Sequence, residues 1–324
     1  FPGGIPYPVF ASMIHLSLRG PGLIQDPAED MKSHPLWDSY WADLKAKVEN
    51  IRIPIYATGS YMHSLHLRGA THSFLNARSR QKWMRLHRDF EWPDFNNPKY
   101  MGDLKLFFDR FLKNIHNGWE MTPRLRMGVT DAYEFDYQVD RPEEEFFPLE
   151  RTQYTKFFLN AEDGTLNREQ PAKEASVSYD AETGDASFDI TFDEDTEISG
   201  FSKLRLWVEA DGNDEMDLFI HVKKINENGE IPLRVFGNDD PGTPGKMRVS
   251  HRELDPEKSR EYLPIHTHTS EQKLKPGEIV PVDIEIYVMA RLWHKGETLR
   301  INVAPRLVRD ESWFLPIVYD TDNK

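Results

Sequence analysis

Histidines and carboxylates gather around two short stretches of this chain, GSYMHS and RDFEWPDF. His63 belongs to the first stretch, His87 directly precedes the second, and Asp89 and Glu91 lie within the second. An imidazole titrates near neutral pH and is the commonest general base, and a carboxylate behind it can orient the ring. We therefore take His87 and His63 as candidate bases, with Asp89 and Glu91 as candidate acids.

The same stretches permit other interpretations. His63 and His66 are three residues apart and could share a helix face, which is a usable spacing for metal ligands. No pattern fixes four ligands, so we expect no metal and no other cofactor; the alternative is that these histidines lie at a domain interface. Ser60 and Ser64 are the serines near these stretches, and neither lies in a G-x-S-x-G motif. We expect turn roles for both.

Two apolar runs must position these stretches. IRIPIYAT at 51–58 and KWMRLH at 82–87 predict short buried strands, and helices are predicted at 64–76 and 98–116. Strand, loop and helix in alternation predict parallel strands joined by crossover helices, with functional residues just past the carboxyl ends of the strands. The 98–116 helix carries an apolar stripe that should pack on the sheet: Leu104, Phe107, Phe108, Phe111, Leu112 and Ile115.

Aromatic residues near the candidate site could form a substrate pocket. A helix is expected at 35–48, and it would carry Trp37 and Trp41 on one face. Together with Tyr61 of the first stretch, these rings could line the pocket for a small substrate. The alternative is that they pack against a neighbouring domain.

Composition limits the class of protein. The chain has 324 residues and a net charge of −14, which argues against nucleic acid and anionic membrane as partners. The absence of cysteine excludes disulfides, thiolate metal sites and a cysteine nucleophile. No apolar run approaches the length of a membrane span, and the N-terminus has no signal-peptide pattern. We favour a cytoplasmic location but leave the compartment open.

From residue 174 onward, short alternating segments follow one another with turns between them, such as ASFDITF, KLRLWVEA, DLFIHVKKI and PVDIEIYVM. Many short strands with no helix between them predict a mostly antiparallel β-sandwich. The predicted fold class is therefore α/β followed by all-β, with a boundary near residue 120.

Several long strings resemble the X-Pro dipeptidyl-peptidase and cocaine-esterase family of serine hydrolases. They are HPLWDSYWADLKAKVENIRIPIYATGSY, KWMRLHRDFEWPDF, DLKLFFDRFLKNIHNGWEMTPRLRM and KLKPGEIVPVDIEIYVMARLWHKGETLRINVAP. The resemblance implies a helical cap segment at 1–50, the C-terminal part of an α/β-hydrolase domain at 51–120, and a jelly-roll β-sandwich at 121–324.

The resemblance also implies a Ser-His-Asp triad, whose serine would precede this chain because FPGGIP resembles a segment after the nucleophile. The family's acid follows the first strand, where this chain has Met62. The family's histidine follows the next strand, and that position falls near Glu91, within four residues of His87 and Asp89. Both positions depart from the family pattern.

Three functions follow from these observations. The chain could be the C-terminal portion of a hydrolase that cleaves small esters or X-Pro peptides, with its nucleophile in another part of the protein. It could instead belong to a pseudo-hydrolase without activity, or its jelly roll could be a ligand-binding or assembly module. We expect its partner to be the N-terminal hydrolase half or another copy of the chain, because the end of the sheet would expose an edge and an apolar face.

Overall fold

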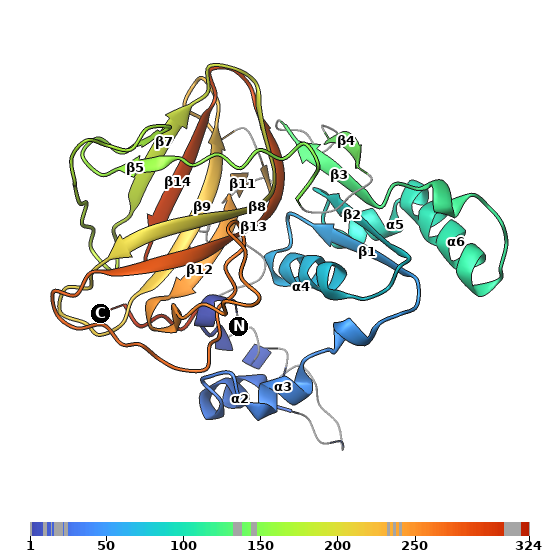
Figure 1. Ribbon diagram of the computed structural model, residues 1–324, viewed down its shortest axis with the longest axis horizontal. Helices are drawn as coiled ribbons and strands as arrows, with labels where there is room; N and C mark the ends of the chain where they lie inside the picture. The colour runs from blue at the N-terminus through green and yellow to red at the C-terminus, as the bar shows by residue number, and fades with distance from the viewer. Residues whose placement is uncertain are drawn as a thin grey trace.

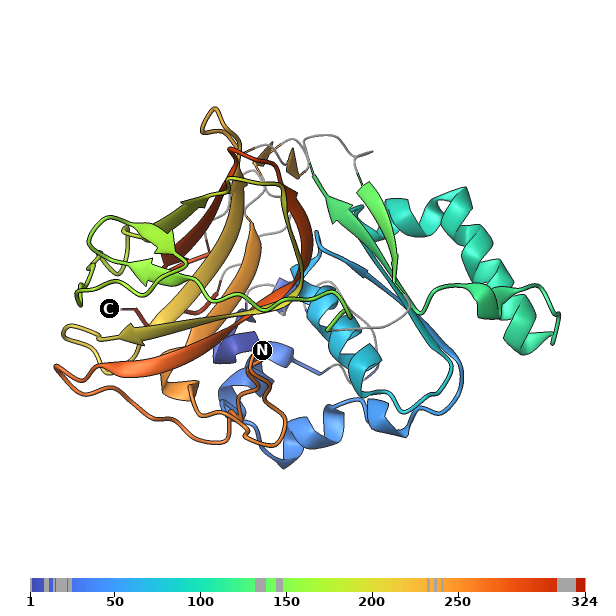
Figure 2. The same ribbon diagram turned by 45° about the horizontal axis from the view of Figure 1, so that its top comes forward.

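The computed structural model describes residues 2–8, 12–13, 15, 22, 25–131, 138–143, 148–231, 234–235, 238–239, 242–307 and 319–323. Helices and parallel strands form one part of the molecule, and mainly antiparallel strands form the other (Figures 1 and 2). The expected combination of an α/β part and a β part is confirmed. Among the described residues, no helix is long and apolar enough to cross a membrane.

The N-terminal segment contains short helices: η1 (Pro2–Gly4), α2 (Pro27–Ser33), α3 (Ser39–Leu44) and η2 (Val48–Asn50). The expectation of one helix over 35–48 is wrong. The side chain of Asp38 accepts the backbone N–H groups of Tyr40 and Trp41, so it caps a helix that begins only at Ser39. The helix then ends at Leu44, because the following residue is extended.

The predicted parallel strands are confirmed. β1 (Ile55–Ser60) pairs in parallel with β2 (Lys82–His87), and Ser60 lies opposite His87 at their carboxyl ends. β1 begins later than the apolar run suggested, at residue 55 rather than 51. Helix α4 (Ser64–Asn76) connects the two strands and packs on one face of the sheet, where its Leu67 and Phe74 join Met84 and Leu86 in a core.

The opposite face of these strands meets α5 (Glu91–Asn96), α6 (Pro98–Leu112) and η3 (Trp119–Met121). Only part of the apolar stripe of α6 packs there. Phe107 and Phe111 contact Trp83, whereas Phe108 and Leu112 are 49% and 77% exposed. The helix ends at Leu112 rather than at residue 116 as predicted, so Ile115, which is 47% exposed, lies beyond it. The stripe covers two adjacent helix faces, and a single face can rest on the strands.

The β part is one layer folded over another around a common apolar core (Figure 2). Its long strands β8 and β13 pair with each other, and side chains such as Leu204 and Ile284 meet Phe188, Ile220 and Val303 of the other layer. The strands after η3 are β3 (Leu125–Thr130), β4 (Gln138–Glu143), β5 (Phe158–Asn160), β6 (Thr165–Asn167), β7 (Ala186–Thr191), β8 (Thr196–Val208), β9 (Asp217–Ile225), β10 (Arg234–Val235), β11 (Asn238–Asp239), β12 (Thr243–Arg248), β13 (Val280–Trp293) and β14 (Thr298–Ala304). A short η4 (Val249–His251) follows β12.

The sheet is continuous across the expected boundary near residue 120. β3 pairs in parallel with β2 and also with β13, through the single partner pair Arg291 and Thr130. In addition, α4 lies against β13, where its core includes Tyr287 and Val288. The α/β part and the β part are therefore joined by backbone pairing as well as by side-chain packing.

A group of histidines lies where the N-terminal segment meets the β part; His251 is buried, and His266 and His268 are partly buried. His251 and His268 place their Nδ1 atoms 3.0 Å apart, and the backbone carbonyl of His268 accepts the N–H of Trp37. Burial lowers the pKa of His266 to about 4. Burial, and then the neighbouring His251 and His266, lower the pKa of His268 to about 3.

These histidines predict a loss of stability in mild acid. Unfolding restores their ordinary pKa near 6.5, so the unfolded state binds more protons than the folded state between about pH 6.5 and pH 3. His266 and His268 should each cost about 2 kcal/mol of stability between pH 7 and pH 5. Thermal melts at pH 7, 6 and 5 should show the decline, and His268→Asn, which tolerates the φ of 54° at this position, should reduce it. An equal decline in the variant would contradict this account.

Candidate active site at the carboxyl ends of β1 and β2

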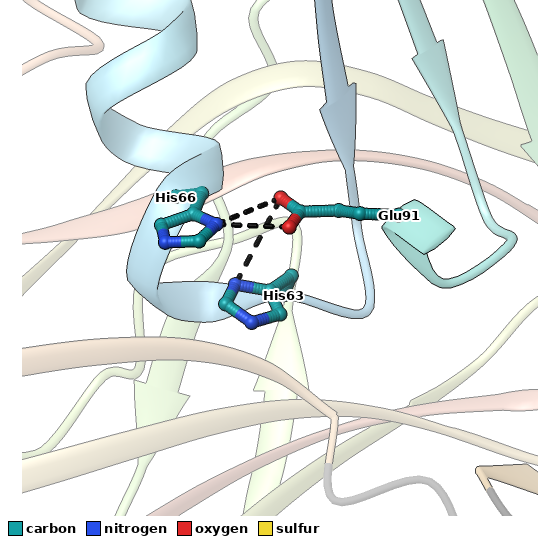
Figure 3. Close-up of side chains that lie close together, drawn as sticks. All are labelled: His63, His66 and Glu91. Carbon is teal, nitrogen blue, oxygen red and sulfur yellow. Dashed lines mark hydrogen bonds and ion pairs between the residues drawn. The ribbon is translucent and has the colours of Figure 1, made fainter. Parts of the chain in front are cut away.

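The two chemically promising stretches meet at the carboxyl edge of the parallel strands, as the sequence predicted. His66 lies in the first turn of α4, which follows β1, and Glu91 opens α5, which follows β2. The Nδ1 atom of His66 is 3.0 Å from Oε1 and 2.9 Å from Oε2 of Glu91 (Figure 3). This contact is a charge-assisted hydrogen bond that fixes the imidazole on a carboxylate.

His63 completes the cluster. It is the N-cap residue of α4, and its Nδ1 atom lies 3.9 Å from Oε1 of Glu91. Its ring stacks on His66 at 4.2 Å between centroids and meets Phe90 edge to face at 5.0 Å. His63 is 9% exposed, whereas the His66 side chain is 63% exposed. Of the two imidazoles in this cluster, that of His66 is therefore the one exposed to solvent.

His87 lies on the opposite face of β2 from the α4 core. It is 2% exposed, and its Nε2 atom is 3.4 Å from Oδ2 of Asp94. Asp94 also receives two hydrogen bonds from Arg85, one of them 2.8 Å between Nη1 and Oδ1. Burial, and then the positive charge of Arg85, lower the pKa of His87 to about 4, so it is neutral at pH 7.

A cleft of about 350 Å³ runs along this face beside the site. Its lining includes Ser60, His87, Glu91, Trp92 and Tyr100. The cleft brings Glu91 of the cluster to the same opening as the buried His87. It is a concave surface where a substrate could lie next to the cluster.

The remaining predicted site residues lie elsewhere or have structural contacts. The Oγ atom of Ser60 donates to the carbonyl of Asp89 at 2.7 Å and accepts the N–H of Met62 at 3.1 Å, so it ties the two loops together. Tyr61 is partly buried against the α4 core. Trp37 and Trp41 belong to the α3 segment and are not among the residues that line the cleft.

His63, His66 and Glu91 also have the chemistry of a metal site, since one ligand atom from each lies within 4.8 Å of the others. Zinc held by nitrogen and oxygen ligands at about 2.0–2.1 Å would need ligand atoms separated by about 3.3 Å, which is near the distances seen. However, the site lies at the N-terminus of α4, where the helix dipole favours negative charge and disfavours a cation. The geometry thus fits a hydrogen-bonded acid–base pair better than a metal centre.

Comparison with known proteins identifies the family. The model of the X-Pro dipeptidyl-peptidase C-terminal non-catalytic domain matches residues 117–305. A CocE/NonD family hydrolase from Staphylococcus aureus is 33% identical, with a TM-score of 0.93 over 100% of this chain and 60% of that one. The chain therefore belongs to the X-Pro dipeptidyl-peptidase and CocE family of hydrolases, and it spans 60% of the length of this relative.

More distant structures share the fold alone. An α-amino acid ester hydrolase has a TM-score of 0.63 and 13% identity, covering 89% of this chain and 55% of that one. An aminopeptidase from a marine sediment Thaumarchaeota archaeon has a TM-score of 0.60 and 15% identity, covering 91% and 53%. A search of curated proteins gave no match.

His66 is not among the candidate bases that the sequence indicated. Its three-residue spacing from His63 indicated only that the two could share a helix face. Glu91 was one of two candidate acids, with Asp89, and it also fell near the position of the family's histidine. The feature that indicates this pair is the parallel pairing of β1 and β2, which places their carboxyl ends side by side. It brings a residue from the first turn after β1 against a residue from the first turn after β2.

Proposed function

We propose that this chain is the C-terminal portion of a serine-hydrolase-family protein that cleaves small esters or X-Pro peptides by acyl transfer to water. The observation that carries the proposal is the imidazole–carboxylate pair of His66 and Glu91, placed at the functional edge of a parallel sheet in a member of a hydrolase family. A base held by a carboxylate is what activation of a serine hydroxyl requires.

The proposal includes the domain organisation expected from the sequence. Residues 1–50 would be a cap segment, 51–120 the end of the hydrolase domain, and 121–324 a jelly-roll sandwich that packs beside it. The folded-over layers of the β part and the pairing of β3 with both β2 and β13 support this arrangement.

The proposed partner is the N-terminal hydrolase portion, which would supply the nucleophile and the oxyanion hole. Two features support it. Among the described residues, β1 is the end strand of the sheet, so its free edge can pair with a further strand. Apolar side chains on α5 and α6 are exposed beside it, including Trp92 at 58%, Phe95 at 60% and Leu112 at 77%.

The test uses the full-length protein. It should label with a fluorophosphonate probe, which reacts with activated serines, and should hydrolyse p-nitrophenyl acetate or an X-Pro-p-nitroanilide. Residues 1–324 alone should self-associate on a sizing column and should bind the N-terminal portion when the two are co-expressed. A well-folded full-length protein that neither labels nor turns over would favour the pseudo-hydrolase suggested by Met62.

A further inference from the structure

We propose that His66 is the general base of this hydrolase and that Glu91 is the acid that orients it. The base would then follow the first of the two strands and the acid the second, which reverses the order implied by the family resemblance. This assignment rests on the proposed hydrolase function, and it explains why Met62 and Glu91 stand where that resemblance expected an aspartate and a histidine.

The hydrogen bond to Glu91 sets the state of the His66 ring. Nδ1 carries the hydrogen, because a carboxylate can only accept, at 2.9 Å from Oε2 and 3.0 Å from Oε1. The other ring nitrogen, Nε2, then has its lone pair available and points away from the carboxylate (Figure 3). This is the tautomer that a general base needs.

The position of the pair also suits its roles. His66 is 63% exposed and Glu91 is 28% exposed, so the base faces solvent while the acid is partly enclosed. The N-terminus of α4, a helix of 13 residues, favours the negative charge of the Glu91 carboxylate.

The other histidines near the strand ends fit the role of base less well. His87 is buried with Asp94 and Arg85, and burial with the charge of Arg85 opposes the imidazolium that a base must become. His63 is 9% exposed under the ring of His66, and its Nδ1 is 3.9 Å from the nearest carboxylate oxygen of Glu91. That separation is too long for a hydrogen bond.

Strand order explains how the reversed pair could work. In the proposed protein, further strands with the nucleophile lie on the β1 side, because β2 is already paired on its other edge with β3. His66 follows β1 and Glu91 follows β2, so the imidazole lies on the side of the nucleophile and the carboxylate lies behind it. The arrangement of serine, imidazole and carboxylate is preserved although the strands that supply them are exchanged.

His66 and Glu91 can carry out the proton transfers of both acylation and deacylation. Nε2 of His66 takes the proton of the serine hydroxyl as Oγ bonds to the substrate carbonyl carbon. As the tetrahedral intermediate collapses, the bond to the leaving alcohol or amine breaks, and Nε2 gives that group the proton. Water then attacks the acyl-serine, Nε2 takes a proton from it, and the serine oxygen leaves with that proton. Glu91 stays ionised throughout and stabilises the transient imidazolium.

The test compares variants in the full-length protein with the same ester substrate. His66→Ala should lower kcat by about 10⁶-fold with little change in KM, and the histidine limb of the pH–rate profile should disappear. Glu91→Gln should also lower kcat steeply, and Glu91→Asp should restore part of it. Because His66 is largely exposed, unchanged melting temperatures should show that the variants fold.

His294→Ala is the matched control, since His294 also pairs with a carboxylate, 2.9 Å from Asp131, but on the turn between β13 and β14. It should retain parental kcat. If His66→Ala labels and turns over like the parent, the assignment of His66 as the base is wrong and the proposed function stands. The same conclusion follows if His63→Ala or His87→Ala loses activity while His66→Ala keeps it. Activity abolished by a chelator and restored by zinc would assign the cluster to a metal instead. A folded parent that neither labels nor turns over would overturn the proposed function and this assignment together.

Discussion

Asp94→Ala should destabilise the full-length protein by about 3–5 kcal/mol, because it leaves a buried guanidinium without its counter-ion. Asp94 is 4% exposed and Arg85 is 5% exposed, and they share two hydrogen bonds across the face of β2. Asp94 also anchors α5, the helix that opens with Glu91, so the variant should reduce turnover as well. Chemical unfolding and ester hydrolysis measure the two effects.

The controls separate the buried charge from a general loss of contacts. Replacing both partners, with Asp94→Leu and Arg85→Met together, should recover much of the lost stability, since no unpaired charge then remains buried. Glu29→Gln removes a solvent-exposed pair with Lys32 and should leave the melting temperature unchanged. A single Asp94 variant as stable as the parent would contradict the account of this pair.

Glu285→Ala should destabilise the protein by about 3 kcal/mol through the junction between its two parts. Glu285 of β13 is 8% exposed and accepts hydrogen bonds from α4, at 2.8 Å from Nε of Arg68 and 3.0 Å from Nε2 of His72. Burial raises the pKa of Glu285, but Arg68 and His72 outweigh burial and hold it at about 2. The carboxylate is therefore charged wherever the protein is folded near neutral pH.

The same contact has a defined pH range. Because the pKa of Glu285 is lower in the folded protein than its ordinary value of 4.5, its contribution is fully present above about pH 4.5 and is lost as the pH falls toward 2. Urea unfolding at pH 7 should show the loss in Glu285→Ala, and the difference from the parent should shrink below pH 4. A difference that stays constant down to pH 3 would show that packing, and not charge, explains the effect.

The elements that position the site were predictable because their sequence patterns are local. Two apolar runs and a capped helix predicted β1, β2 and α6, and parallel pairing put both polar stretches at one edge. The start of α3 was misplaced because capping by Asp38 outweighs the aromatic periodicity around it. The exposed half of the α6 stripe was not predictable, since periodicity shows which side chains are apolar but not what covers them.

The pairing inside the site depended on tertiary contacts. Helical spacing joined His63 to His66, but the choice of His66 as the partner of Glu91 depends on how α4 and α5 leave their strands. The sequence also did not predict that β3 joins the α/β part to the β part, because its few residues pair with β2 and β13, which are far apart in the sequence. Residues at such junctions carry little local signal.

The most direct test is a crystal structure of the full-length protein after reaction with a fluorophosphonate, which marks the nucleophile covalently. We expect Nε2 of His66 to lie about 2.6–3.2 Å from the phosphonylated serine oxygen, or from the water that attacks the phosphorus, with Glu91 still hydrogen-bonded to Nδ1. A different histidine in that position, or His66 and Glu91 both bound to a metal ion, would contradict it.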